Sequence, residues 1–274
     1  MSTTAFSAMP ADFEPTRATL HAYAHAFGAI PRVHAIAHPK WWHISLNVRP
    51  NGLVTEAMAL PSGGAAHLRM DLNAHHIALE TSTGRQLHFS MTDGITGSEM
   101  GDALIAAVAD LGLEGDYHRE KFESDEAREY DPATAARFFA VLTDVHHALA
   151  RHRATLEGDV GPLQVWPHGF DLAFEWFGTR TESYEEHGEM REHPSQINFG
   201  FYPGGDPYLY ANPWPFDAAV LLETQLPAGA EWHTEGWQGT MLPYSEVAGR
   251  PDAAERILAY TKAVYEAAAP TLLV

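Results

Sequence analysis

The sequence contains no cysteine. Disulfides, thiolate metal sites, iron–sulfur clusters and cysteine nucleophiles are therefore excluded. It also contains no apolar run near the ~18 residues that a membrane span needs. The start, "MSTTAFSAMPADFEPT", lacks the basic and apolar regions of a signal peptide. We therefore expect a cytoplasmic protein without a membrane partner.

Positive charge is scarce. Lys and Arg number 17 against 36 Asp and Glu, which gives a formal net charge of -19. This charge repels the phosphates of nucleic acids, so a nucleic-acid partner is not expected. It suits a neutral or cationic ligand, or a metal ion. Histidine is abundant by contrast, with 17 residues, and it is the commonest metal ligand and a frequent acid or base.

The familiar catalytic motifs are also missing. We find no phosphate-binding glycine loop, no Gly-x-Ser-x-Gly elbow, no dinucleotide fingerprint and no His-Glu-x-x-His. A nucleotide cofactor and an α/β-hydrolase fold are therefore not expected. The oligomeric state stays open.

The first half of the chain changes its hydrophobic period once. Residues 12–30 have helical spacing and are predicted to form a helix that ends near Pro31. From 41–48 the period is two, and turn residues separate further segments with the same period. We predict an antiparallel meander of these segments, followed by a helix over 97–113 with Ser98 as its cap. The strands are predicted at 41–48, 52–60, 66–73, 76–82 and 86–92.

The second half follows an acidic segment, 120–132, which we take as the boundary. Residues 131–158 are predicted to form a long helix capped by Asp131. The segment 182–195 is charged and aperiodic, so we interpret it as a mobile loop that covers a cleft. The remaining predictions are strands at 163–177, 195–203, 207–215 and 231–243, and a final helix over 251–269.

These elements indicate an α+β fold in which antiparallel sheets pack with helices, because hairpin-length turns dominate and no βαβ alternation occurs. Residues 1–120 and 131–274 both contain a helix, several strands and a helix. Each half also carries a Trp-x-His segment, at 41–43 and 166–168. We interpret this as a weak internal duplication, in which the two halves form separate domains or share one core.

Ionisable residues gather on two segments of the second half. His168 lies between Pro167 and Gly169, at a bend that leads into a strand on which Asp171 and Glu175 share a face. In "EWHTEGW", alternation places His233, Glu235 and Trp237 on one face. If these strands are neighbours, the imidazoles and carboxylates converge around a cavity that Asp171 and Glu175 floor.

Three roles are open for this group. His168, Asp171, His233 and Glu235 suit a divalent transition metal such as Zn, Fe or Mn with open positions. The same four residues suit general acid–base catalysis without a metal. A purely structural role, with each polar group satisfied by hydrogen bonds, is the third.

Aromatic rings are dense around residues 198–216. Asn198, Tyr208, Tyr210 and Trp214 lie on two strands joined by a Pro-Gly-Gly-Asp turn. Such rings line ligand clefts or stack on sugars, although they also fill ordinary sheet cores. The candidate ligand-binding residues are Trp166, Glu175, Asn198, Tyr208, Tyr210, Trp214 and Trp237. His146, His147 and His152 on the long helix are expected to be solvated or to cover the edge of the core.

Four blocks of the sequence together resemble a known family. They are "WWHISLNVRPNGL", "FDLA" after "VWPHG", "INFGFYPGGDPYLYANPWPF" and "WHTEGWQGTMLPYSEV". They are similar to the bacterial domain-of-unknown-function 5996 family, and the similarity spans nearly the whole chain. The resemblance implies no substrate or mechanism.

Three hypotheses of function follow. In the first, the chain is an enzyme that acts on a small polar molecule in a cleft lined by aromatic, His and carboxylate side chains, with or without a metal. In the second, it binds a sugar-like or amine-like molecule without turnover. In the third, it is a structural or partner-binding protein with an aromatic core.

Overall fold

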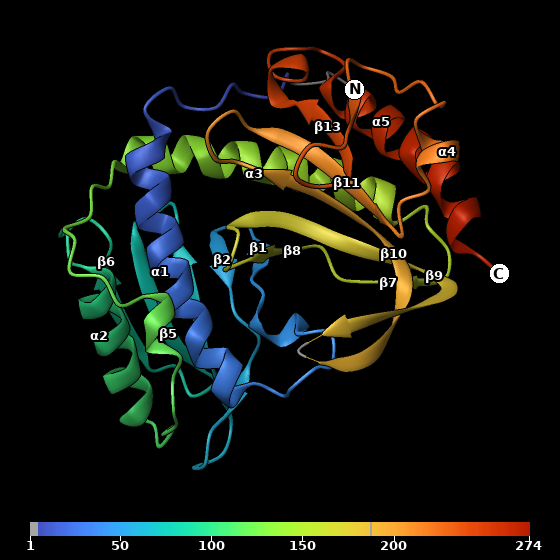
Figure 1. The fold of residues 1–274 in the computed structure, drawn as a ribbon. Coiled ribbons are helices and arrows are strands. Elements are labelled where there is room, and N and C mark those ends of the chain that lie inside the picture. The colour runs from blue at the N-terminus through green and yellow to red at the C-terminus, as the bar shows by residue number, and fades with distance from the viewer. Residues whose placement is uncertain (1–4, 187) are drawn as a thin grey trace. The chain divides into compact units, whose positions relative to one another are not determined.

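The structure is a computed structural model that describes residues 5–186 and 188–274. Within these residues, helices combine with two antiparallel sheets (Figure 1), which confirms the predicted α+β class. The chain divides into two compact units. The N-terminal unit comprises residues 9–140 and 164–171. The C-terminal unit comprises residues 141–163 and 172–274, with the segment that ends at Ala8.

The division falls inside a helix, α3 (Pro132–Arg153), between residues 140 and 141. The sequence placed the boundary in the acidic segment 120–132 instead. The helical periodicity runs unbroken through residue 140, so no change in composition marks the division. The predicted cap is confirmed, because the Thr134 backbone N–H donates to Asp131 Oδ1 at 2.7 Å.

α1 (Phe13–His34) is the long helix of the N-terminal unit. Leu20, Tyr23 and Phe27 are fully buried along one side of it, which confirms the helix predicted for 12–30. The helix continues past Pro31 to His34. A proline in the last turn removes a single backbone donor, and the Pro31 carbonyl still accepts from the Ala35 N–H at 2.9 Å.

The sheet of the N-terminal unit is the predicted antiparallel meander. Its order is β1-β2-β4-β5-β6, and β3 pairs with β4. The strands are β1 (Asn47–Arg49), β2 (Gly52–Val54), β3 (Met58–Ala59), β4 (Ala65–Asp71), β5 (His76–Thr81) and β6 (Gln86–Ser90). β8 (Gln164–Trp166) also belongs to this unit and bridges to it through Leu46 and Val165.

Two of the predicted strands are interrupted. Residues 41–48 are not one strand, because Trp41 adopts a left-handed φ of 61° and starts the 3-10 turn η1 (Trp42–Ile44). Residues 52–60 divide into β2 and β3 at Thr55. The Thr55 hydroxyl, in place of a backbone carbonyl, accepts from the Leu68 N–H at 3.0 Å and so breaks the ladder.

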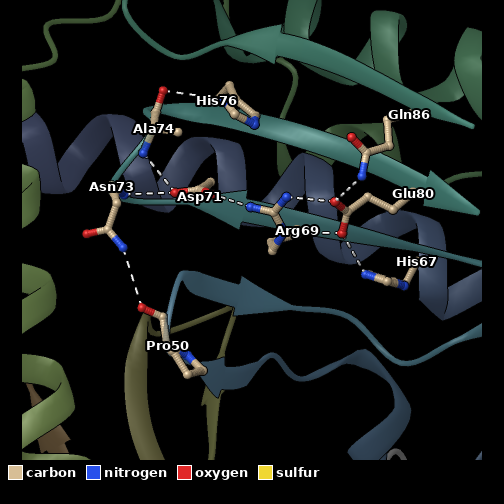
Figure 2. Close-up of polar contacts among 9 residues, drawn as sticks. All are labelled: Pro50, His67, Arg69, Asp71, Asn73, Ala74, His76, Glu80 and Gln86. Carbon is tan, nitrogen blue, oxygen red and sulfur yellow. Dashed lines mark hydrogen bonds and ion pairs between the residues drawn. The ribbon is translucent and has the colours of Figure 1, made fainter. Parts of the chain in front are cut away.

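The two faces of the meander differ in character. Leu68, Met70 and Leu79 are buried on one face. The other face carries the ion-pair network around Arg69 and Glu80 that Figure 2 shows. This alternation is the period of two expected for a sheet with one apolar face.

Arg69 is fully compensated within this network. Its guanidinium donates to both carboxylate oxygens of Glu80, at 2.7 and 3.1 Å, and also pairs with Asp71. The hydrogen bonds from Arg69 hold the pKa of Glu80 below its usual range. His67 and Gln86 also bond to Glu80 (Figure 2). The charge of Arg69 is therefore used in ion pairs within the sheet, which link β4 to β5.

α2 (Gly97–Ala109) begins with a capping box. The Thr96 side chain accepts from the Glu99 N–H at 3.1 Å, and the Glu99 side chain accepts from the Thr96 N–H at 2.7 Å. The prediction of Ser98 as the cap is therefore wrong. Ser98 lies inside the helix, and its hydroxyl donates to the Ser124 carbonyl.

The C-terminal unit is built on the other sheet, of order β12-β13-β11-β10-β9-β7. Phe174, Phe199 and Leu209 are buried on one of its faces. α5 (Ala253–Ala268) contacts β10 and β11 and buries Tyr260 and Val264. The strands are β7 (Asp159–Val160), β9 (Asp171–Glu186), β10 (Glu189–Tyr202), β11 (Tyr208–Trp214), β12 (Glu231–His233) and β13 (Gly239–Pro243). The short helices are η2 (Arg119–Lys121) in the N-terminal unit and α4 (Ala218–Leu221), η3 (Tyr244–Glu246) and η4 (Ala269–Leu272) here.

Two predictions in this unit are wrong. Residues 182–186 and 189–195 do not form a loop, because they belong to β9 and β10, which pair as a long antiparallel hairpin. His187, within the predicted loop, lies outside the described residues. Met190, Arg191 and Glu192 follow one another in β10 and are all exposed, so no alternation of buried and exposed residues marks this part of the strand. Residues 231–243 are not one strand either. β12 and β13 form a hairpin, and its turn contains Gly236 with a φ of 81°.

No helix among the described residues is long and apolar enough to span a membrane.

Candidate functional site

The predicted site residues are divided between the two units. Trp166, His168 and Asp171 belong to the N-terminal unit. The C-terminal unit holds Glu175, Asn198, Tyr208, Tyr210, Trp214, His233, Glu235 and Trp237. Across residues 5–186 and 188–274, no group of three or more His, Cys, Asp or Glu side chains is placed to hold a metal ion. The four-residue metal centre therefore stays a prediction without geometric support.

His168 lines a cavity of about 350 Å³ in the N-terminal unit, a size at the lower end of small-molecule sites. We call this cavity the cationic pocket. It is lined by His25, Gly28, Ala29, Arg32, Ile44, His118, Lys121, Pro167 and His168. Five of these nine side chains are basic or imidazole, and none is acidic.

One face of α1 forms a wall of the pocket. His25, Gly28 and Arg32 recur at the helical spacing of three and four residues, so they lie in one row. Gly28 allows the chain at Pro167 to come close, because a Cβ at position 28 would lie 2.9 Å from the Pro167 ring. This close approach places His168 beside the helix.

His21 and His25 are stacked one turn apart, with ring centroids 4.6 Å from each other. His21 Nε2 lies 3.2 Å from the His168 carbonyl oxygen, which only accepts, so this nitrogen carries the hydrogen. Burial lowers the pKa of His21. Burial, followed by electrostatic repulsion from His21, His168 and Lys121, lowers the pKa of His25 to about 4. His25 is therefore neutral at pH 7.

Arg32 and Lys121 supply the permanent positive charge. The Arg32 guanidinium lies 4.9 Å from the centroid of the Trp41 ring, a cation–π contact. In the described part of the chain, neither side chain forms an ion pair with a carboxylate. His118 differs, because its Nδ1 lies 3.1 Å from Glu120. The pocket thus holds two cations without an ion-pair partner among the residues that the structure describes.

The other predicted residues of this unit lie close to His168 in sequence. The Trp166 ring packs edge-on against the His168 ring at 5.8 Å. Phe170 has a φ of 52° and donates its N–H to the Trp166 carbonyl, which makes the tight turn that presents His168. Asp171 follows as the first residue of β9 and is not among the residues that line the pocket.

The C-terminal unit has a polar and aromatic sheet face. Asn198 pairs in register with Glu175 on one side, and Gly200 pairs with Tyr210 on the other. Tyr208 and Trp214 alternate with buried residues along β11, so they share this face. The Asn198 side-chain oxygen is buried without a hydrogen-bond partner. Five predicted ligand-binding residues of this unit therefore lie on one face.

The turn between β12 and β13 changes the prediction for His233 and Glu235. The His233 ring packs against Trp237 at 4.5 Å, and Trp237 stacks near Tyr208 at 6.4 Å. Glu235 lies in the turn and is exposed. Strict alternation does not place these three residues on one strand face, because residues 234–238 are outside the strands. The predicted arrangement is therefore wrong at Glu235.

Sequence reasoning missed most of the cationic pocket. His21, His25, Gly28 and Arg32 were read only as part of an amphipathic helix, and Lys121 only as part of an acidic segment. A row of two histidines, a glycine and an arginine at i, i+4, i+7 and i+11 along α1 was the available signal. It indicates a second face of α1, which lines a cavity instead of packing in the core.

Comparison with known proteins agrees with the resemblance in the sequence. The profile of the family of unknown function DUF5996 matches residues 6–272. The chain belongs to this DUF5996 family. No curated protein and no solved structure matches the chain. Membership in DUF5996 leaves the activity to be argued from the geometry of the site.

Proposed function

We propose that this chain is an enzyme that binds a small anionic molecule in the cationic pocket and transfers protons to it through the pocket histidines. The observation that carries the proposal is a cavity of about 350 Å³ lined by Arg32 and Lys121, with no acidic side chain in its wall. In a chain of net charge -19, uncompensated cations beside a cavity favour an anion there.

The recognition step rests on charge and hydrogen bonding. Arg32 offers a planar fork of N–H donors that matches a carboxylate or phosphate group. Lys121 supplies a second positive charge. Ile44 and Ala29 provide apolar wall, which lowers the local dielectric constant and strengthens the attraction. A small molecule with one carboxylate or phosphate group and a polar body fits this lining.

The chemical step rests on His25. Its imidazole is neutral in the free pocket because burial, and to a lesser extent repulsion from Lys121 and the neighbouring imidazoles, opposes its protonation. A bound anion opposes that effect, so it raises the pKa of His25 and increases the fraction of imidazolium. The imidazolium that forms donates its proton to the bound molecule as a general acid.

The alternative is a binding protein without turnover. It is favoured by the fact that no hydroxyl or carboxylate side chain is among the nine residues that line the pocket, so the pocket wall offers no nucleophile of those kinds. Both functions use the same contacts for binding, and only product formation separates them.

The test begins with calorimetric titration of inorganic phosphate, succinate and small phosphate esters into the protein. We expect Arg32→Gln and Lys121→Gln each to weaken the binding of the best anion by about tenfold. Lys262→Gln is the matched control, because Lys262 is 70% exposed in the C-terminal unit. Absence of anion binding, or an equal loss in the Lys262 variant, would contradict the proposal. Nuclear magnetic resonance of the incubated ligand then shows whether it is consumed.

A further inference from the structure

The C-terminal unit contains a second cavity, of about 350 Å³. Its lining residues differ from those of the cationic pocket. It is lined by Tyr184, His193, Gln196 and Trp214. All four residues belong to the C-terminal unit. Three of the four are rings, and none is a cation of fixed charge. We call this group the aromatic cage.

The three rings form adjoining walls. The Trp214 ring lies 6.1 Å from the Tyr184 ring with an angle of 85° between their planes, and 6.1 Å from the His193 ring with an angle of 86°. Tyr184 and His193 are 6.3 Å apart with an angle of 59°. Rings set nearly at right angles around a cavity present several π faces to one occupant.

An irregularity in the sheet brings these residues together. His193 and Gln196 are three positions apart, and in an unbroken strand they would point to opposite faces. The pairing of β9 with β10 shifts register between Pro194 and Gln196. Such an interruption re-aims side chains, and Figure 1 shows the β9–β10 hairpin bending away from the rest of its sheet.

The local charge selects the sign of the occupant. Residues 180–193 contain five glutamates and two arginines. The hairpin that carries Tyr184 and His193 is therefore negative, which concentrates cations near the cavity. Glu182, the cross-strand partner of His193, is paired with Arg180 at 2.5 Å. The other glutamates of the hairpin add to the negative potential.

We propose that the aromatic cage binds the methylated ammonium group of a small molecule. A methylated ammonium carries diffuse positive charge over an apolar surface, so it gains from π faces and loses little hydration on entering an aromatic cavity. The Gln196 side chain supplies an amide oxygen and amide hydrogens for the polar remainder of the ligand. No residue of this site lines the cationic pocket of the N-terminal unit.

The test is titration of the protein with choline, trimethyl-lysine and the neutral isostere 3,3-dimethylbutanol. Tryptophan fluorescence and calorimetry measure the binding. We expect one of the two cations to bind at least about tenfold more tightly than the isostere, because removal of the charge removes the cation–π attraction. Preference between choline and trimethyl-lysine identifies a free metabolite or a modified amino acid as the source. Equal binding of the isostere, or no binding of either cation, overturns the proposal.

Matched variants localise the site. Trp214→Leu is expected to weaken binding of the preferred cation by about tenfold, whereas Trp232→Leu, which removes another half-buried indole of the same unit, leaves it unchanged. Tyr184→Leu, on the solvated hairpin, is the second variant in case Trp214→Leu does not fold. Unchanged binding in a folded Trp214 or Tyr184 variant would overturn the assignment to this cavity.

Discussion

His25 and His152 both have a pKa lowered to about 4, but the two regions around them are built differently. His152 lies in α3 within the C-terminal unit, is 3% exposed, and contacts the Phe199 ring at 4.9 Å. Burial alone lowers its pKa. His25 lines a cavity, and electrostatic repulsion from His21, His168 and Lys121 adds to the effect of burial.

The difference shows that the size of a pKa shift does not identify a functional histidine. His152 is held neutral by a core that no ligand reaches, so its shift affects stability. His25 is held neutral beside a cavity with unpaired cations, so a bound anion alters its protonation. The cause of the shift and the access of a ligand separate the two cases.

The largest expected effect concerns acid stability and His152. Its pKa is about 4 in the folded protein and near 6.5 when unfolded, so the unfolded state binds more protons between these values. The free energy of unfolding therefore falls as pH drops through this window, by about 3 kcal/mol for this group. We expect the free energy of unfolding of His152→Leu to fall less than that of the wild type between pH 7 and pH 4. Urea unfolding at the two pH values measures this difference.

The control for this prediction is His147→Leu, which changes an exposed histidine of the same helix. It should not reproduce the gain in acid stability expected for His152→Leu. Equal acid sensitivity in the wild type and in His152→Leu would show that His152 is not kept neutral by the core.

The second expected effect concerns the response of His25 to a bound anion. Saturation with the tightest-binding phosphate or carboxylate should raise the pKa of His25 by about one unit, since an anion favours its charged form. The pKa of His152 should stay the same. Titration followed by nuclear magnetic resonance of imidazole signals measures both, and a shift at His152 alone would refute the assignment of the pocket.

The smallest expected effect concerns the contribution of Lys121 to the pKa of His25. Lys121 lowers the pKa of His25 through repulsion, but it contributes less than burial, His21 and His168 do. Lys121→Gln should therefore raise the pKa of His25 in the free protein by less than about one unit. Lys262→Gln should not change it. A fall in the pKa of His25 in the Lys121 variant would contradict the electrostatic account of the pocket.

Much of the fold was predictable because apolar residues follow a regular period. The burial of Leu20, Tyr23 and Phe27 on α1, and the strands of the meander, follow from spacing alone. The prediction failed where side chains replace backbone contacts, as at Thr55, and where consecutive residues of a strand are all exposed, as at the start of β10.

The candidate sites were less predictable. His168 was identified as a site residue, but its partners in the cationic pocket come from α1 and from the segment around Lys121, which are distant in sequence. The net charge of -19 favoured a neutral or cationic ligand, whereas this pocket suits an anion. Net charge is a sum over the surface and does not fix the sign at one cavity. His152 was expected at the edge of the core and is buried inside it.

Because the register shifts between Pro194 and Gln196, the aromatic cage depends on the number of residues in this part of β10 as much as on their identity. Insertion or loss of a single residue between His193 and Gln196 would rotate one of them to the other face, even if every ring were kept. Relatives that keep the cage should therefore show no gap across these four positions. In relatives that have such a gap, the cavity should lose one wall whatever their composition.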